Sequence, residues 1–240
     1  RSAAEVAARA DVFITMVPRS EDSRAVYEEI LPVLDASKLC IDMSTIDPAE
    51  SVALADAVKK TGASFIDAPV VKSRPAAEAG TLGIYVGGSE EAFKRALPVL
   101  RYMGENILRM GGQGKGLVMK ICHNALVSQI QNGVNETAAL ASAFGIDILS
   151  YARAIAIGGG QNAYLDTKKS ALAAEDYEAA FSVRNMHKDV GICTRLAADA
   201  GVPMPGEENV KLVYDEAVAR GLGPEDFCAT AKVVRGRIEA

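Results

Sequence analysis

The chain has 240 residues, of which 49% are hydrophobic and 24% charged, the profile of a folded globular protein. The net charge is −5 and no basic stripe is present, so nucleic acid is not an expected partner. The longest apolar runs, such as residues 12–17, are too short to cross a membrane. The length therefore leaves room for one large domain or two modest ones.

The first half of the chain alternates apolar runs with amphipathic segments. Strands are predicted at residues 11–17, 38–42, 64–67, 83–86 and 106–109, and helices at residues 3–9, 21–34, 48–61 and from Ser89 onward. Residues 11–17 are almost continuously apolar, as expected for a strand covered on both faces. The alternation predicts an open, mainly parallel sheet with helices on both faces.

The second half contains no segment with the pattern of a strand after Gly116. One helix of nearly 30 residues is predicted from Leu117 to about Phe144, and shorter helices are predicted at residues 148–157, 184–200, 207–220 and 225–238. Gly201 and Gly221 directly follow two of these helices, a common position for glycine. The predicted fold class is therefore α/β, with a doubly wound sheet followed by an all-α region.

Four cysteines are scattered along the chain without a C-x-x-C pair: Cys40, Cys122, Cys193 and Cys228. This spacing favours free thiols in a reducing cytoplasm over a disulfide framework. With only two histidines, the sequence predicts no metal site.

The strongest motif is residues 114–124, Gly-Lys-Gly-Leu-Val-Met-Lys-Ile-Cys-His-Asn. Glycines at the start of a helix allow its backbone to approach another surface closely. Lys120, His123 and Asn124 then follow at spacings of three and four residues, which place them on one side of the helix. Three polar side chains thus converge on a rigid, mostly apolar helix, a suitable platform for catalysis.

This pattern, G-x-G-x-x-x-K-x-x-H-N, resembles the catalytic signature of the β-hydroxyacid dehydrogenase family, which includes 3-hydroxyisobutyrate and 6-phosphogluconate dehydrogenases. The His-Asn ending is most similar to the 6-phosphogluconate dehydrogenase branch. Further segments resemble the family in the same order along the chain: residues 10–18, 42–48, 67–88, 181–189 and 201–205. The resemblance covers the whole chain.

The resemblance implies an NAD(P)-dependent oxidoreductase that transfers hydride from the hydroxyl-bearing carbon of a 3-hydroxy acid to the cofactor. Lys120 is then the general base, and the acid in the reverse direction. A free lysine has a pKa of about 10.4, which burial beside other cations lowers toward about 7–8. Asn124 and His123 are the implied substrate-binding residues, although a histidine in an apolar helix can also be an ordinary core group.

The resemblance also implies that Val17, Pro18, Thr45 and Lys188 contact the cofactor. Each has a simpler interpretation. Val17 and Pro18 could only end a strand, Thr45 could cap the helix that starts near Pro48, and Lys188 could be an ordinary helix lysine.

The predicted substrate loop departs from the family pattern, which commonly reads Pro-Val-Ser-Gly-Gly. Here Val71 stands in the serine position and Lys72 in the first glycine position, followed by Ser73 and Arg74. Because valine offers no side-chain hydrogen bond, we expect Lys72, Ser73 or Arg74 to bind an acidic group of the substrate instead. The alternative is a surface loop with ordinary charges.

The glycine-rich strand–turn–helix motif that opens a dinucleotide-binding domain is absent from the first half. Residues 158–163 match G-x-G-x-x-A only formally, because they follow a predicted helix. The expectation is therefore an N-terminally truncated Rossmann-like domain at residues 1–113 and an all-helical substrate and dimerisation domain at residues 114–240. Binding of NAD or NADP by these residues alone should be weak or absent.

The active site is expected in the cleft between the two domains, and the helical domain favours a homodimer or homotetramer. Other functions remain open. The chain could be an oxidative decarboxylase of the 6-phosphogluconate type, a non-catalytic dinucleotide-binding relative, or a relative of the imine reductases, although Lys120 disfavours the last two.

Overall fold

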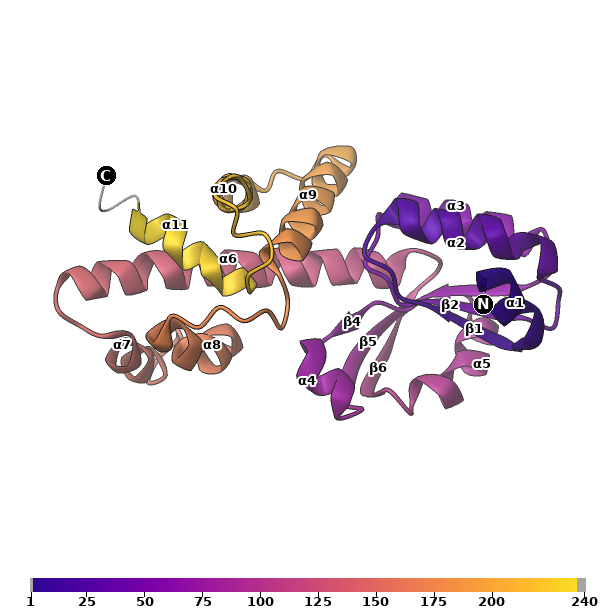
Figure 1. Ribbon diagram of the computed structural model, residues 1–240, viewed down its shortest axis with the longest axis horizontal. Helices are drawn as coiled ribbons and strands as arrows, with labels where there is room; N and C mark the ends of the chain where they lie inside the picture. Colours follow the sequence, from indigo (N-terminus) through magenta and orange to yellow (C-terminus); the bar gives the residue numbers. More distant parts are fainter. Residues whose placement is uncertain (1, 237–240) are drawn as a thin grey trace. The chain divides into compact units, whose positions relative to one another are not determined.

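The computed structural model describes residues 2–236 (Figure 1). The chain divides into two compact units, Arg1–Ile121 and Cys122–Ala240, and each is described by itself. The predicted domain boundary after residue 113 stays a prediction. No helix in the described range combines the length and the apolar character that a membrane span requires.

The first unit is built on a six-stranded sheet (Figure 1). Its strands are β1 (Val12–Thr15), β2 (Leu39–Asp42), β3 (Ser64–Asp67), β4 (Val70–Val71), β5 (Leu82–Gly87) and β6 (Gly104–Gly111). They run in the order β1-β2-β3-β5-β4, with β6 also paired to β5. Pairs β1–β2, β2–β3 and β5–β6 are parallel, whereas β3–β5 and β4–β5 are antiparallel.

The two antiparallel pairs follow from a short connection. Only α4 (Ser73–Glu78) lies between β4 and β5. A helix of six residues is too short to return the chain for a parallel crossover, which takes a dozen or more residues. The sheet is therefore mainly parallel, as predicted, with antiparallel pairing of β5 to β3 and β4.

Helices cover both faces of the sheet, as predicted. The remaining helices of this unit are α1 (Ala3–Arg9), α2 (Ser20–Ile30), the 3-10 turn η1 (Leu31–Val33), α3 (Pro48–Lys59) and α5 (Glu90–Leu100). One face packs with α1, α2 and α3 around Phe13, Tyr27 and Phe65. The other packs with α5 around Ile41, Ile66 and Leu100.

The strand β1 is not covered on both faces, contrary to the prediction. Ile14 is 40% exposed and Met16, just beyond the strand, is 67% exposed. In the described range β1 pairs with β2 alone, and α5 packs against β2 and β3. Within residues 2–236, β1 is therefore the last strand of the sheet.

The second unit is helical. It contains most of α6 (Lys115–Ala143), together with α7 (Ile148–Ile155), α8 (Ala163–Ala174), α9 (Val183–Ala200), α10 (Pro205–Ala219), the 3-10 turn η2 (Phe227–Thr230) and α11 (Ala231–Gly236). Its core includes Tyr151, Leu165, Met186, Val213 and Tyr214. The long helix α6 confirms the prediction to within two residues at its start.

Two elements of this unit differ from the sequence prediction. The helix α8 was not predicted, because its alanine- and lysine-rich segment presents few large apolar residues. The helix predicted at residues 225–238 begins instead as η2, where the Asp226 carboxylate caps the turn by accepting the Cys228 N–H at 3.1 Å. Residues 237 and 238 lie outside the described residues.

Candidate active site

The first turn of α6 packs directly against the backbone of the sheet. A Cβ atom added to Gly116 would lie 2.6 Å from the Tyr85 carbonyl oxygen and 2.8 Å from Asp67 Oδ2. Gly114 adopts a left-handed φ of +79°, a conformation that glycine takes at no steric cost. Only glycine therefore allows the chain to turn into α6 at this distance from β5.

The buried carboxylate of Asp67, at the end of β3, holds this helix start in place. Its Oδ1 accepts the Gly114 N–H at 2.7 Å and the Gln113 side-chain N–H at 2.8 Å, and its Oδ2 accepts the Leu117 N–H at 2.9 Å. Burial raises the pKa of Asp67, and the backbone donors of Gly114 and Leu117 oppose that rise. These N–H groups would otherwise lack partners at the helix start.

Lys120 lies four residues beyond Gly116, and so on the same side of α6 as the glycine that meets β5. The lysine is only 8% exposed. A buried amine on the first turns of a helix with an immobilised start is held in a defined position, which a reacting group requires.

A hydrogen bond connects the segments that follow β1 and β2, which contain the predicted cofactor residues. The Val17 N–H donates to Ser44 Oγ at 2.9 Å, while Pro18 is exposed and Thr45 is half-buried. Thr45 does not cap α3, because the Asp47 side chain accepts the Ala49 N–H at 3.0 Å and is the cap. The simpler interpretation of Thr45 is therefore wrong.

This edge of the sheet is where the nicotinamide end of the cofactor is predicted to bind. In open α/β sheets ligands bind beyond the carboxyl ends of the strands, and Met16 is exposed at that edge. The described residues offer no glycine-rich cradle for the pyrophosphate. Residues 158–160 form an exposed turn between α7 and α8 rather than following a strand.

The predicted substrate loop contains two residues in the left-handed conformation. Lys72, between β4 and α4, has φ +85°, and Ser73, the first residue of α4, has φ +60°. Both residues are exposed. Left-handed non-glycine residues cost about 1–3 kcal/mol each and persist where the surrounding structure requires them. Val71 packs over Gly83, since a Cβ atom added to Gly83 would lie 2.5 Å from Val71 Cγ2.

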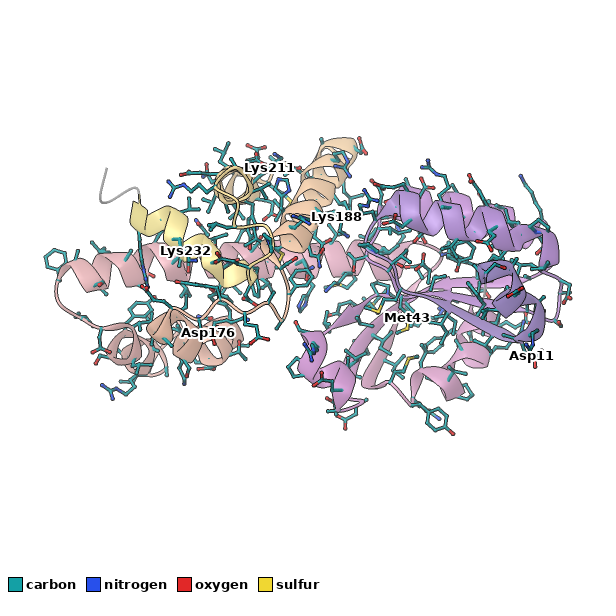
Figure 2. The ribbon with its side chains drawn as sticks, in the orientation of Figure 1. Asp11, Met43, Asp176, Lys188, Lys211 and Lys232 are labelled. Carbon is teal, nitrogen blue, oxygen red and sulfur yellow. The ribbon has the colours of Figure 1, made fainter. Side chains whose placement is uncertain are left out.

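In the second unit, Asp189 connects two of the predicted site residues. The Asn124 side-chain N–H donates to Asp189 Oδ2 at 2.6 Å, and the Lys188 ammonium lies 3.0 Å from Asp189 Oδ1. Asn124 and Asp189 are buried, while Lys188, on α9 (Figure 2), and His123 are half-buried. Because a carboxylate only accepts hydrogen bonds, it fixes the orientation of the Asn124 amide.

Known proteins resemble both parts of the chain. A family model described as the NAD binding domain of 6-phosphogluconate dehydrogenase matches residues 1–112. A second, described as NAD-binding of NADP-dependent 3-hydroxyisobutyrate dehydrogenase, matches residues 114–234. The 3-hydroxyisobutyrate dehydrogenase of Pseudomonas aeruginosa is 34% identical over 98% of this chain and 83% of its own length.

The chain belongs to the β-hydroxyacid dehydrogenase family. The 2-(hydroxymethyl)glutarate dehydrogenase of Eubacterium barkeri is 30% identical over 95% of this chain and 77% of its own length. The structure of Mycobacterium tuberculosis 3-hydroxyisobutyrate dehydrogenase with L-serine superposes with a TM-score of 0.89 at 31% identity, over 98% of this chain and 83% of that one. The predicted class, an NAD(P)-dependent oxidoreductase of 3-hydroxy acids, is confirmed.

Two buried acids of this β-hydroxyacid dehydrogenase were not identified from the sequence as parts of a site. Asp67 follows an apolar strand, but its partners lie nearly fifty residues later in the chain. Glu207 is fully buried on α10 and accepts from Ser128 Oγ at 3.1 Å and Gln129 Nε2 at 3.3 Å. Burial raises the pKa of Glu207 to about 7.

No group of three or more histidine, cysteine or acidic side chains within residues 2–236 is arranged to hold a metal ion. All four cysteines are free thiols. Burial raises the pKa of the Cys40, Cys193 and Cys228 thiols to about 12. These three thiols are therefore poor nucleophiles at neutral pH.

Proposed function

We propose that Lys120 is the general base of the dehydrogenase reaction on a 3-hydroxy acid. The observation that carries this proposal is a buried amine, 8% exposed, on a helix whose first turn is held by three hydrogen bonds to Asp67. Such a position supplies a proton acceptor at a fixed point, and general base catalysis typically contributes about 10²–10⁴ in rate.

In this mechanism the substrate hydroxyl donates its proton to Lys120 Nζ while its carbon is oxidised. NAD(P), when bound, supplies the acceptor for the hydride. In the reverse direction the protonated lysine returns the proton to the carbonyl oxygen. Asn124, whose amide is oriented by Asp189, positions the substrate, and His123 assists in binding it.

The cofactor contacts are assigned to Val17, Pro18, Thr45 and Lys188. The hydrogen bond between the Val17 N–H and Ser44 Oγ supports the first three, because it fixes the edge of the sheet where a nicotinamide would lie. Lys188 is held by Asp189, the same carboxylate that orients Asn124. One buried acid thus supports both a substrate residue and a cofactor residue.

The proposed substrate carries an acidic group bound by Lys72 or Ser73, with Val71 forming part of the loop. The left-handed backbone of Lys72 and Ser73 supports this role, because glycine, which the family pattern has at these two positions, adopts that conformation at no steric cost. The similarity to 2-(hydroxymethyl)glutarate dehydrogenase supports a small carboxylic acid as the substrate class.

The role of Lys120 is tested by Lys120→Met in the protein that contains these 240 residues, at saturating NAD(P). We expect kcat to fall by about 10²–10⁴, with an unchanged circular dichroism spectrum. Lys115→Met is the matched control, because Lys115 is exposed on the same helix and its loss should leave kcat within about twofold. Activity retained by Lys120→Met refutes the proposal.

The role of Lys72 is tested with a panel of 3-hydroxy acids that differ in the number of carboxylates. Lys72→Ala should raise the KM of the best acidic substrate by about tenfold, the effect of one lost charge-assisted hydrogen bond. An unchanged KM across the panel removes Lys72 from the substrate site. Lys94→Ala is the control, because Lys94 lies on α5, outside the loop, and pairs with Glu90 at 2.6 Å.

We also propose that these 240 residues alone bind NAD or NADP weakly, because they contain no glycine-rich pyrophosphate loop. Isothermal titration should show a Kd well above the micromolar range, and micromolar binding contradicts this.

The proposed assembly is a cytoplasmic homodimer or homotetramer. Leu140 and Phe144, near the end of α6, are 61% and 80% exposed, and exposed large apolar side chains support an interface. Light scattering should give twice or four times the chain mass.

A further inference from the structure

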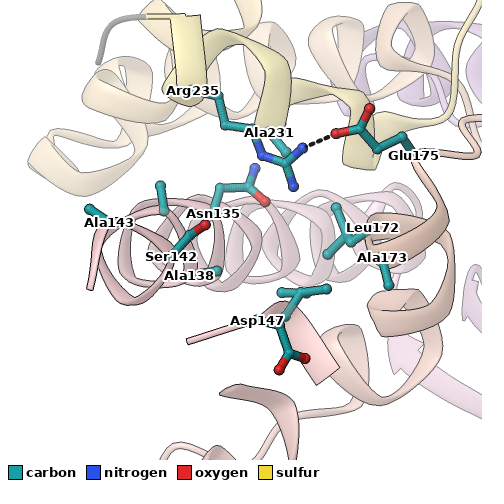
Figure 3. Close-up of a pocket in the computed structure, with 12 residues that line it drawn as sticks. Asn135, Ala138, Ser142, Ala143, Asp147, Leu172, Ala173, Glu175, Ala231 and Arg235 are labelled. Carbon is teal, nitrogen blue, oxygen red and sulfur yellow. Dashed lines mark hydrogen bonds and ion pairs between the residues drawn. The ribbon is translucent and has the colours of Figure 1, made fainter. Parts of the chain in front are cut away.

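A pocket of about 480 Å³ lies within the second unit, apart from the residues proposed for catalysis (Figure 3). It is bounded by the last turns of α6, the start of α7, the end of α8, and α11. Much of its wall is small or aliphatic, including Ala138, Ala143, Ala173 and Leu172. Its size suits a small organic molecule.

Asn135 lines the pocket, and the orientation of its amide is set by a chain of hydrogen bonds. The Tyr214 hydroxyl donates to Gln131 Oε1, so the Gln131 amide nitrogen faces the opposite way and donates to Thr230 Oγ1 and the Phe227 carbonyl. Thr230 in turn donates its hydroxyl hydrogen to the Phe227 carbonyl at 3.1 Å.

The Thr230 oxygen therefore has only lone pairs left, and it must accept from Asn135 Nδ2 at 3.0 Å. These hydrogen-bond directions determine that the Asn135 amide nitrogen faces Thr230 and that its oxygen, Oδ1, faces away from Thr230. That oxygen is buried and has no hydrogen-bond partner within residues 2–236, and Asn135 is only 4% exposed. A buried acceptor of this kind needs a donor from water or from a ligand.

The charges around the pocket favour a cation. Asp147 and Glu175 line it against a single guanidinium, Arg235, which is paired with Glu175 (Figure 3). The pKa of Asp147 is lowered, chiefly by the hydrogen bond from Ser150, so the carboxylate is charged at neutral pH. The lining thus has one net negative charge.

We propose that this pocket is a second small-molecule site, which binds an aliphatic primary ammonium ion whose N–H donates to Asn135 Oδ1. Three features of the pocket match three features of such a ligand. The orphan oxygen requires a donor, the net negative lining attracts a positive charge, and the alanine-rich wall accommodates a short alkyl chain. Ser142, which also lines the pocket, offers a second acceptor.

The test uses n-butylammonium chloride as the probe and isothermal titration or amide NMR shifts as the readout. For a ligand of this size we expect a Kd of about 1–10 mM. n-Butanol should bind at least about tenfold more weakly, because it lacks the charge, and sodium n-butyrate should not bind.

Asn135→Leu should weaken n-butylammonium binding by at least about tenfold, whereas Asn132→Leu, on the same helix but outside the pocket lining, should not. Ala138→Leu, which fills the pocket and leaves the amide network intact, should also abolish binding. That variant keeps the test decisive if Asn135→Leu fails to fold.

The proposal is overturned if the ammonium probe does not bind, if n-butanol binds as tightly, or if Asn135→Leu or Ala138→Leu binds like the unmodified chain. In the first case the pocket holds water only, and in the others the probe binds without using its charge, the Asn135 oxygen or this pocket. None of these measurements depends on dehydrogenase activity, so their outcome is independent of the role of Lys120.

Discussion

Two buried carboxylates, one in each unit, contact α6 in different ways. Asp67 meets the start of the helix and accepts three N–H groups, two of them from the backbone. Glu207 meets the middle of the helix, accepts two side-chain donors, and leaves Oε1 without a partner in the described structure. Burial raises the pKa of both acids, but only Asp67 has backbone donors that oppose the rise, and these donors belong to the helix start that it anchors.

The largest effect should come from removing the anchor. Asp67→Ala removes the acceptor of the Gly114 and Leu117 backbone N–H groups and one of the two acceptors of the Gln113 amide. We expect the free energy of unfolding to fall by about 3–5 kcal/mol. Since Lys120 depends on this helix start, kcat should also fall, by about tenfold or more, with a smaller change in KM. Denaturant unfolding and steady-state kinetics measure both effects.

The control is Ser89→Ala, which removes the cap of α5, where Ser89 Oγ accepts the Ala92 N–H at 3.1 Å, and should cost about 1 kcal/mol without affecting kcat. Equal effects of the two variants would show that Asp67 is merely another cap.

The next largest loss of stability should come from disturbing the close approach of α6 to β5, which Asp67 holds in place. Gly116→Ala places a methyl group 2.6 Å from the Tyr85 carbonyl oxygen, and we expect a loss of about 3 kcal/mol. Gly112→Ala is the matched control, because a Cβ atom there meets nothing within 4 Å. If the melting temperatures of the two variants agree, the helix start is less tightly packed than described.

The acid in the second unit should give a smaller effect that depends on pH. The pKa of Glu207 is raised to about 7 in the folded chain from an ordinary 4.5, so the folded state binds the proton more tightly. This contribution to stability is complete below about pH 4.5 and is lost as pH rises through about 7.

Glu207→Gln should abolish this dependence. When the pH is raised from 5 to 8, the free energy of unfolding of the unmodified chain should fall by about 2 kcal/mol relative to that of the variant. Chemical denaturation at both pH values measures the difference. Parallel pH profiles of the two proteins contradict a raised pKa for Glu207.

Local features of the chain could be predicted from the sequence, whereas contacts between distant residues could not. Residues 114–124 predicted α6 and its polar side chains, because the signal is local. The anchor at Asp67 could not be predicted, because its donors lie 46 to 50 residues away in the chain.

The antiparallel pairing of β5 with β3 and β4 likewise depends on which strands meet, and periodicity does not report that. The loop at Lys72 was recognised from its departure from the family pattern. Its left-handed backbone became visible only in the structure.

The central claim, that the Lys120 amine accepts the substrate proton, is tested most directly by chemical rescue. Lys120→Ala should lose at least about 10² in rate, and added ethylamine should restore activity in proportion to the free amine, with no gain in Lys115→Ala. The claim is contradicted if Lys120→Ala keeps a rate within about threefold of the unmodified enzyme and ethylamine has no effect on it.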